Sequence, residues 1–449
     1  MRGVSHIVDR LAFKSTGRRT GQQILEAMES LGGNIQCASS RESIMYQCAT
    51  FNSAVPSAVG LLAETIREPL LTEEEVQQQL ATADYEIGEI WSKPELILPE
   101  LVHLAAYKDN TLGNPLLCPK ERLEVINKST IDAYMKHFYR PESTIVAFAG
   151  VDHSEAVKLT ERYFGDMKTP GKLSQSANST ASSTLTTSAP DNSRFPPPDM
   201  TIPSHYTGGF LTLPPIQPPP NPALPRLSYI HLAFEALPIS SPDIYALAVL
   251  QTLLGGGGSF SAGGPGKGMY SRLYTNVLNQ HGWIENCVAF NHSYTDSGIF
   301  GIGAACAPSR IDAMLEIMCR ELHALTLDTG YAALGEVEVL RAKNQLRSSL
   351  LMNLESRLVE LEDLGRQVQV HGHKIGVKEM CRRIEDVTVQ DLRRIARQVV
   401  HGHVENEGQG SGAPTVVLQQ GEEENQQLRH FPWSEIQERI ARWSLGASR

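Results

Sequence analysis

The sequence predicts an α+β fold made of two related domains, each with a mainly antiparallel sheet and helices on one face of that sheet. Two observations support this prediction. Segments that alternate between apolar and polar residues come in neighbouring pairs, as in antiparallel strands, and long segments with helical periodicity follow them. This order occurs in both halves of the 449-residue chain, which points to an ancient duplication.

The first half contains a pair of alternating segments followed by helical ones. Its predicted elements are strands at 34–39, 43–51 and 144–149 and helices at 55–67, 72–106 and 154–164. The long helix has Thr72 as a favourable N-cap. Its first turn carries Glu73, Glu74 and Glu75, which the positive end of the helix dipole stabilises.

The second half repeats this style on a larger scale. Its predicted elements are strands at 229–234, 283–291, 298–305 and 415–419 and helices at 242–254, 309–325, 334–364, 377–384 and 389–400. The middle two strands are close enough in sequence to form a hairpin. Residue identity between the two halves is too weak to prove the duplication.

The two halves are separated by a segment that does not have globular composition. From 174 to 193, 11 of 20 residues are Ser or Thr, and prolines follow. Such a segment buries too little apolar surface to offset the entropy lost on ordering. We therefore predict a domain at 1–170, a disordered insertion at 171–205 and a second domain at 206–449. Because a motif begins five residues after Met1, we also expect that a first strand is missing from this chain.

Composition excludes several classes of protein. The formal net charge of −10 argues against nucleic acid as a partner and fits a basic ligand better. The longest apolar stretch, 244–254, is too short to span a bilayer, so an integral membrane protein is not expected. Seven scattered cysteines, without a C-x-x-C pair, indicate a reducing compartment.

The first chemical motif is a damaged zinc site near the N-terminus. The inverted zinc-peptidase motif H-x-x-E-H places two histidines and a general base on one helix, with a distant glutamate as third ligand. His6 is present, but Asp9 replaces the glutamate and Arg10 replaces the second histidine. Arginine stays protonated and cannot bind zinc. We expect no metal on this chain, with His6 packed in a helix and Arg10 paired to a carboxylate such as Glu86.

The second motif is a glycine-rich segment at 255–268, in which eight of 14 residues are glycine. It fails the phosphate-binding P-loop pattern because Ser261 stands at the first glycine and Gly268 follows Lys267. It also fails the dinucleotide pattern at Ser261. Glycine allows unusual dihedral angles and close approach of a ligand to the backbone. A binding or gating loop is therefore favoured over a passive linker.

The third feature is the acidic character of the predicted helix 334–364. Glu338 and Asp363 lie 25 residues apart, so they would share a face if the helix were unbroken. An acidic helix face is commonly only a solvated surface. A site for a basic ligand remains the alternative.

Together these segments resemble the alpha-subunit family of mitochondrial processing peptidases, within the pitrilysin-like peptidases. The resemblance rests on H-I-V-D-R-L-A-F-K-S-T from His6 to Thr16, on the glycine-rich segment with its continuation M-Y-S-R-L-Y to Tyr274, and on residues 341–357 and 362–367. It covers nearly the whole chain outside 171–200. It implies two related α+β domains that form a half-shell closing on a partner subunit.

The resemblance also implies a function. Members pair with a zinc-bearing beta subunit in the mitochondrial matrix, and the heterodimer removes basic N-terminal presequences from imported precursors. The alpha subunit is non-catalytic, and Zn²⁺ is expected only in the beta partner. The glycine-rich loop takes part in substrate binding and product release, and acidic residues recognise the presequence. The matching positions here are Gly255, Gly256, Gly257, Gly258, Gly263, Gly264, Gly266, Lys267, Gly268, Glu338, Glu362 and Asp363.

Three other functions compete with this one. A core structural subunit of the respiratory cytochrome bc complex is the main alternative, although such relatives usually lack the full glycine-rich loop. An independent zinc peptidase conflicts with Asp9 and Arg10. A nucleotide-binding protein rests only on glycine content and fails on motif spacing.

Overall fold

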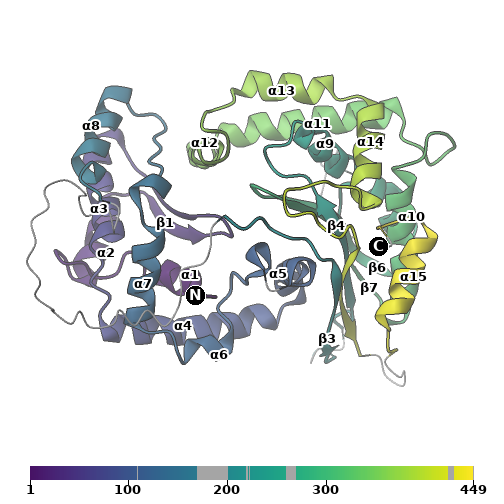
Figure 1. The fold of residues 1–449 in the computed structure, drawn as a ribbon, viewed down its shortest axis with the longest axis horizontal. Helices are drawn as coiled ribbons and strands as arrows, with labels where there is room; N and C mark the ends of the chain where they lie inside the picture. Colours follow the sequence, from purple (N-terminus) through teal and green to yellow (C-terminus); the bar gives the residue numbers. More distant parts are fainter. Residues whose placement is uncertain are drawn as a thin grey trace, which may run out of the picture. The chain divides into compact units, whose positions relative to one another are not determined.

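The computed structural model describes residues 1–108, 110–168, 201–218, 221, 223–258, 269–422 and 429–447 (Figure 1). The chain forms two compact units. Unit 1 comprises Met1–Glu89 and Leu116–Thr201, and unit 2 comprises Ile90–Pro115 and Ile202–Arg449. Residues 90–115 therefore belong with the C-terminal part of the chain, whereas the sequence places them in the domain 1–170.

Unit 1 is mostly helical around a two-stranded antiparallel sheet. Its helices are α1 (Val4–Leu11), α2 (Gly21–Ser30), α3 (Val55–Arg67), α4 (Glu73–Trp91), α6 (Lys120–Leu123), α7 (Lys128–Phe138) and α8 (His153–Phe164). Strands β1 (Asn34–Ser39) and β2 (Ile44–Ala49) pair in the predicted hairpin, in which Ser40 N–H donates to the Ser43 carbonyl at 2.8 Å. The apolar face of α1 packs on α4, because Ile7 and Leu11 share one buried cluster with Leu80 and Ile87.

Unit 2 is built on a six-stranded sheet in the order β3-β8-β4-β7-β6-β5. All neighbours are antiparallel except β3 and β8, which are parallel. The strands are β3 (Gly209–Ile216), β4 (Ser228–Ala236), β5 (Gly256–Gly258), β6 (Ile284–Ser293), β7 (Gly298–Cys306) and β8 (Thr415–Gly421). The predicted hairpin is β6–β7, and β5 places the first glycines at the edge of the sheet.

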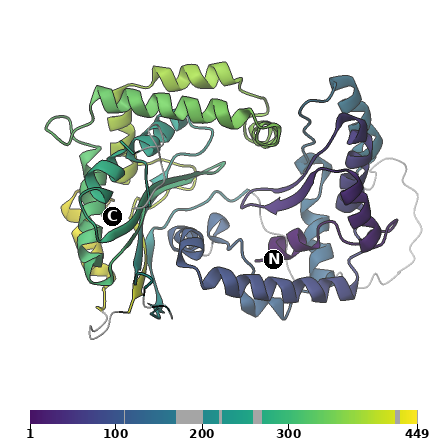
Figure 2. The same cartoon turned by 180° about the vertical axis from the view of Figure 1, so that it is seen from behind.

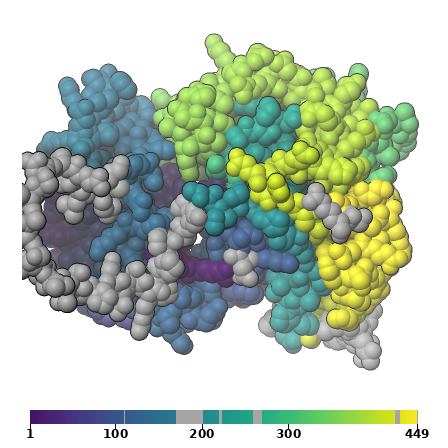
Figure 3. All heavy atoms as spheres, viewed as in Figure 1, coloured from purple at the N-terminus to yellow at the C-terminus, as the bar shows by residue number. Residues whose placement is uncertain are grey.

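Most helices of unit 2 cover one face of this sheet. They are α9 (Ile244–Leu254), α10 (Ile311–Ala324), α11 (Glu336–Leu354), α12 (Arg357–His371), α13 (Val377–Asp386), α14 (Val389–Val400) and α15 (Trp433–Arg442). Leu232 and Phe234 of β4 pack with Leu247, Met318 and Ile395 in one large buried cluster. The last helix, α15, forms part of the outer surface of unit 2 (Figure 3). The predicted α+β architecture is confirmed.

Helix α5 (Pro94–Tyr107) lies on the opposite face of the sheet from α10 and α14, as Figures 1 and 2 show. A buried polar network holds it there. Tyr107 Oη is 3.0 Å from Ser297 Oγ, which donates to Glu235 Oε1 at 3.2 Å, and Asn406 Nδ2 donates to the same oxygen at 2.8 Å. Glycine at 410 leaves room for this carboxyl, since a Cβ there would come within 1.8 Å of Glu235 Oε2.

Two predicted helices are each broken in two. The predicted helix 72–106 ends at Trp91, and α5 starts at Pro94. Proline disfavours helical geometry in the residue before it but suits the first turn of a new helix. The predicted helix 334–364 ends at Leu354, and α12 restarts at Arg357 with Ser356 as its N-cap.

Other predictions have mixed outcomes. Residues 144–149 are predicted as a strand but form none, because no other described segment pairs with their backbone in a sheet. Most of the predicted insertion, 171–200, lies outside the described residues. In the last part, 201–205, Ser204 is buried and its N–H donates to Asp296 Oδ2 at 2.6 Å, whereas the other four residues are exposed. No helix in the described part of the chain is long and apolar enough to cross a bilayer.

The polar network predicts a pH-dependent stability. Glu235 is 1% exposed, and burial raises its pKa from the ordinary 4.5 to about 7. Between these values the folded chain holds a proton that the unfolded chain has released. The contribution of Glu235 to stability therefore falls as pH rises across this window, by roughly 3 kcal/mol, and levels off above pH 7.

The substitution Glu235→Gln should remove most of this dependence. The measurement is the thermal unfolding midpoint at pH 8 minus that at pH 5, which should be more positive in the variant than in the unchanged chain. Glu336→Gln, at an exposed glutamate on α11, is the matched control and should leave the difference unchanged. An unchanged difference in Glu235→Gln would show that this carboxyl does not set the pH dependence.

Candidate functional site

The four positions of the damaged zinc motif come together in unit 1. His6 and Arg10 lie one turn apart on α1, and Glu86 faces them from α4. His6 Nε2 is 3.4 Å and Arg10 Nε is 3.3 Å from the same oxygen, Glu86 Oε2. The ion pair predicted for Arg10 is thus present. A fixed guanidinium charge occupies the space beside Glu86 where a metal ligand would stand.

The surroundings of His6 fix its tautomer. The Cys118 backbone N–H donates to His6 Nδ1 at 3.3 Å, so Nδ1 is unprotonated and the proton of a neutral ring sits on Nε2. His6 Nε2–H then donates to Glu86. Burial lowers the pKa of His6, the hydrogen bond with Glu86 raises it, and the charge of Arg10 lowers it. Both ring nitrogens are therefore committed within the chain.

Asp9 is also committed to the fold. Its Oδ2 accepts the Ser39 N–H at 2.8 Å, which ties α1 to the end of β1. A general base in a zinc site must reach a metal-bound water, and this carboxylate holds a backbone amide instead. The residues present do not fit a zinc ion. In the part of the chain that the structure describes, no three His, Cys, Asp or Glu residues are arranged to hold a metal.

The described part of the glycine-rich segment is Gly255–Gly258, and the predicted residues Gly263, Gly264, Gly266, Lys267 and Gly268 lie outside the described residues. Gly256 has φ +98°, and a Cβ there would come within 2.0 Å of the Cys287 carbonyl oxygen. Gly255 has φ +57° and packs against Ser271. Both positions therefore require glycine. A Cβ on Gly258 would meet no described atom closer than the Glu285 carbonyl oxygen at 4.0 Å, so contacts with described residues do not require glycine there.

Glu338 forms a tight ion pair with Arg272. Arg272 donates from Nε to Glu338 Oε2 at 2.8 Å and from Nη2 to Oε1 at 2.6 Å. Glu338 Oε1 also accepts the Gly335 N–H at 2.8 Å. The Arg272 side chain is only 8% exposed. This carboxylate is therefore largely satisfied by its own chain.

Glu362 and Asp363 lie on α12, in the second half of the predicted acidic helix. The break after Leu354 means that Glu338 and Asp363 do not share a face of one helix, contrary to the prediction. Glu362 is exposed, and no ion pair links it to another described residue. Asp363 is partly exposed and accepts a hydrogen bond from Gln367 Nε2 at 2.7 Å. Of these three acids, Glu362 is the carboxylate most available to a cation.

Three contacts of these sites were not predicted. They involve Arg272, Ser39 and Cys118, which hold Glu338, Asp9 and His6 in place. Each partner is at least 30 residues away along the chain. No local pattern marks such pairs, because they depend on tertiary packing.

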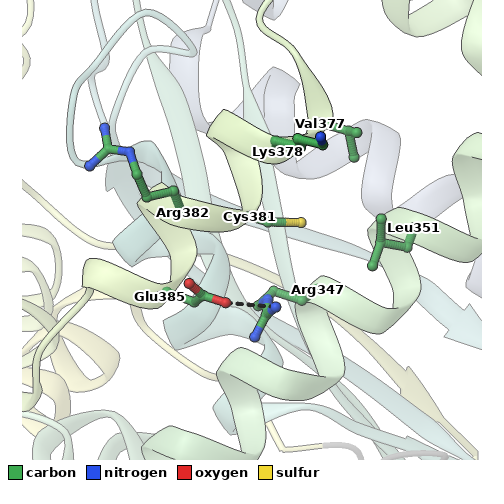
Figure 4. Close-up of a pocket in the computed structure, with 7 residues that line it drawn as sticks. All are labelled: Arg347, Leu351, Val377, Lys378, Cys381, Arg382 and Glu385. Atoms are coloured by element: carbon green, nitrogen blue, oxygen red, sulfur yellow. Dashed lines mark ion pairs between the residues drawn. The ribbon is translucent and has the colours of Figure 1, made fainter.

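A cavity of about 260 Å³ lies between α11 and α13 (Figure 4). Its lining residues are Arg347, Leu351, Val377, Lys378, Cys381, Arg382 and Glu385. The only acid among them, Glu385, is paired with Arg347 at 2.6 Å. Because three of the lining residues are cations, the cavity does not suit a basic peptide. None of the predicted site residues contributes to it.

The His6 geometry yields a measurable prediction. Replacing Arg10 with Met removes a positive charge that lowers the pKa of His6, while Glu86 stays in contact with the ring. The pKa of His6 should therefore rise, as followed by its imidazole NMR signal over a pH titration. Arg18→Met, which removes an exposed charge paired with Glu68, should leave His6 unchanged. A lower or equal pKa in Arg10→Met would refute this account of the site.

Comparison with known proteins identifies relatives over most of the chain. Residues 1–120 match the insulinase family, peptidase family M16, and residues 126–346 match the M16 inactive domain. The mitochondrial-processing peptidase subunit alpha of Neurospora crassa is 63% identical over 487 residues, covering 99% of this chain and 84% of the relative. The probable subunit alpha of Schizosaccharomyces pombe is 46% identical over 417 residues, covering 93% and 77%.

A solved structure shows the same fold. A chain of complex III2 from Candida albicans, bound to Inz-5, superposes with a TM-score of 0.70 at 17% identity and covers 98% of this chain and 89% of that one. The resemblance inferred from the sequence is confirmed. The chain belongs to the M16 peptidase family, among the alpha subunits of mitochondrial-processing peptidase.

Proposed function

We propose that this chain is the non-catalytic, substrate-recognition subunit of a heterodimeric processing peptidase. It binds the basic N-terminal presequence of an imported precursor, and a beta-type partner carrying Zn²⁺ cleaves it in the mitochondrial matrix. The observation that carries the proposal is the Arg10–Glu86 ion pair, which stands where an active relative needs a metal ligand. The names of the relatives supply the process.

The charge of the chain supports a basic substrate. Presequences are rich in Arg and poor in acids. The net charge of −10 attracts such a peptide, and exposed carboxylates raise its concentration near the surface. Glu362 is the strongest candidate for direct contact, with Asp363 beside it. The backbone of Gly255–Gly258, at the sheet edge, allows an extended segment to approach closely.

The division of labour is tested by mixing purified subunits. A fluorescent presequence peptide containing Arg is incubated with this chain alone, with a beta-type relative alone, and with both. We expect cleavage only in the mixture, because the described residues of this chain hold no metal site and we assign recognition of the presequence to this chain. Cleavage by this chain alone would overturn the proposal. Tight association without cleavage would instead favour a structural core-subunit role.

The acidic residues of α12 are tested by removing one charge at a time. Glu362→Gln and Asp363→Asn should each raise the KM of the mixed enzyme about two- to fivefold, the effect of losing one exposed ion pair. The increase in KM should shrink at high salt. Dissolved ions screen the attraction between exposed charges, and the distance over which that attraction acts becomes shorter as the salt concentration rises.

The matched control is Glu438→Gln. Glu438 is an exposed acid on α15, and its substitution changes the net charge by the same amount. It should leave KM unchanged. Equal increases in KM for Glu438→Gln and Glu362→Gln would show that only total charge matters and that α12 is not a contact site.

A further inference from the structure

Arg272 connects three segments of unit 2 that are distant in sequence. Besides its two bonds to Glu338, it donates from Nη1 to the Ala332 carbonyl at 2.9 Å and from Nη2 to the Ala333 carbonyl at 3.0 Å. The guanidinium thus joins its own segment to the loop before α11 and to the first turn of α11. Its planar fork is suited to such a junction, and lysine cannot reproduce it.

The residues beside Arg272 hold the glycines. Ser271 Oγ accepts the Gly256 N–H at 3.1 Å, and Ser271 is 7% exposed. A Cβ on Gly255 would come within 2.4 Å of the Ser271 Cβ, so the two backbones pack closely. Tyr270 is fixed as well: Arg341 Nη1 donates to its carbonyl at 3.0 Å. The placement of Gly255 and Gly256 therefore depends on where residues 270–272 are anchored.

Glu338 has little capacity left for a substrate. Its two oxygens accept three hydrogen bonds from the chain, and a guanidinium lies at 2.6 Å. A substrate cation would have to compete with Arg272, which is buried and cannot lose its proton. Glu338 is therefore poorly placed to attract a basic side chain.

We infer that Arg272 is a positioning residue for peptide binding, and that Glu338 acts through Arg272 rather than by contact with the substrate. The pair anchors the segment 270–272 to α11, and this segment packs against Gly255 and holds the Gly256 amide through Ser271. The inference deepens the proposed function and rests on it for the identity of the peptide. It assigns different roles to two acids of the acidic region: Glu338 positions, whereas Glu362 faces solvent.

The test is a double-mutant cycle in the full chain mixed with its beta-type partner. Glu338→Gln, Arg272→Lys and the double variant are compared by KM and kcat for a presequence peptide. Each single variant should raise KM on the order of tenfold, since a small misplacement of a binding group has effects of this size or larger. The KM of the double variant should be no higher than that of the more impaired single variant, because both substitutions break the same junction.

The control cycle pairs Arg272→Lys with Glu362→Gln, and these effects should multiply because the two residues act independently. Arg272→Lys keeps the positive charge, so a purely electrostatic role of Glu338 predicts a normal KM for that variant. The inference would be overturned if the increases in KM caused by Glu338→Gln and Arg272→Lys multiplied in the double variant. A normal KM in Arg272→Lys would also overturn it.

A second measurement does not depend on activity. Hydrogen exchange at the Gly256 amide should be faster in Arg272→Lys and Glu338→Gln and unchanged in Glu362→Gln. Unchanged exchange in Arg272→Lys and Glu338→Gln would contradict the positioning role, whether or not the mixed enzyme is active. An inactive mixed enzyme would count only against the proposed function. Should Arg272→Lys fail to fold, Ser271→Ala removes the bond to Gly256 directly. It should raise KM and accelerate the same amide, and normal values would refute the inference.

Discussion

The ion pair between Arg10 and Glu86 is the constraint on which the function proposed for this chain depends. It joins α1 to α4 through a carboxylate that also contacts His6, and it fills with a permanent positive charge the place that a dication would need. Repulsion between that charge and a metal ion opposes zinc binding, in addition to the loss of one ligand. Residues 1–120 match the M16 peptidase family, and an internal ion pair stands where the intact motif would place a metal ligand.

Unit 2 carries the features that suit binding. Its edge strand β5 consists of glycines, with glycine geometry required at Gly256 and at the preceding Gly255, and its helix α12 exposes Glu362. Arg272 and Glu338 link the glycines to the start of α11. An ion pair with this little exposure contributes mainly geometry, because desolvation offsets much of the attraction between its charges. We therefore propose separate tasks for two acids: Glu362 recognises the substrate by charge, and Glu338 positions the glycines through Arg272.

Local patterns predicted the parts of the fold that depend on neighbouring residues. The β1–β2 and β6–β7 hairpins followed from alternation. The contact between Arg10 and Glu86, which are distant in sequence, followed from a known motif with a distant third ligand. The breaks near Pro94 and Ser356 were missed because helical periodicity continues across them, although Pro94 is itself a signal for a helix start. The Arg272–Glu338 pair spans 66 residues, so only the folded sheet and helices bring it together.

In the assembled heterodimer, this chain should contribute no metal to catalysis. The most direct measurement is the anomalous X-ray scattering of that heterodimer at the zinc absorption edge. We expect a zinc peak in the beta-type subunit only, with Arg10 still paired to Glu86 in this chain. A zinc peak between His6 and Glu86, with Arg10 turned away, would contradict the proposed division of labour.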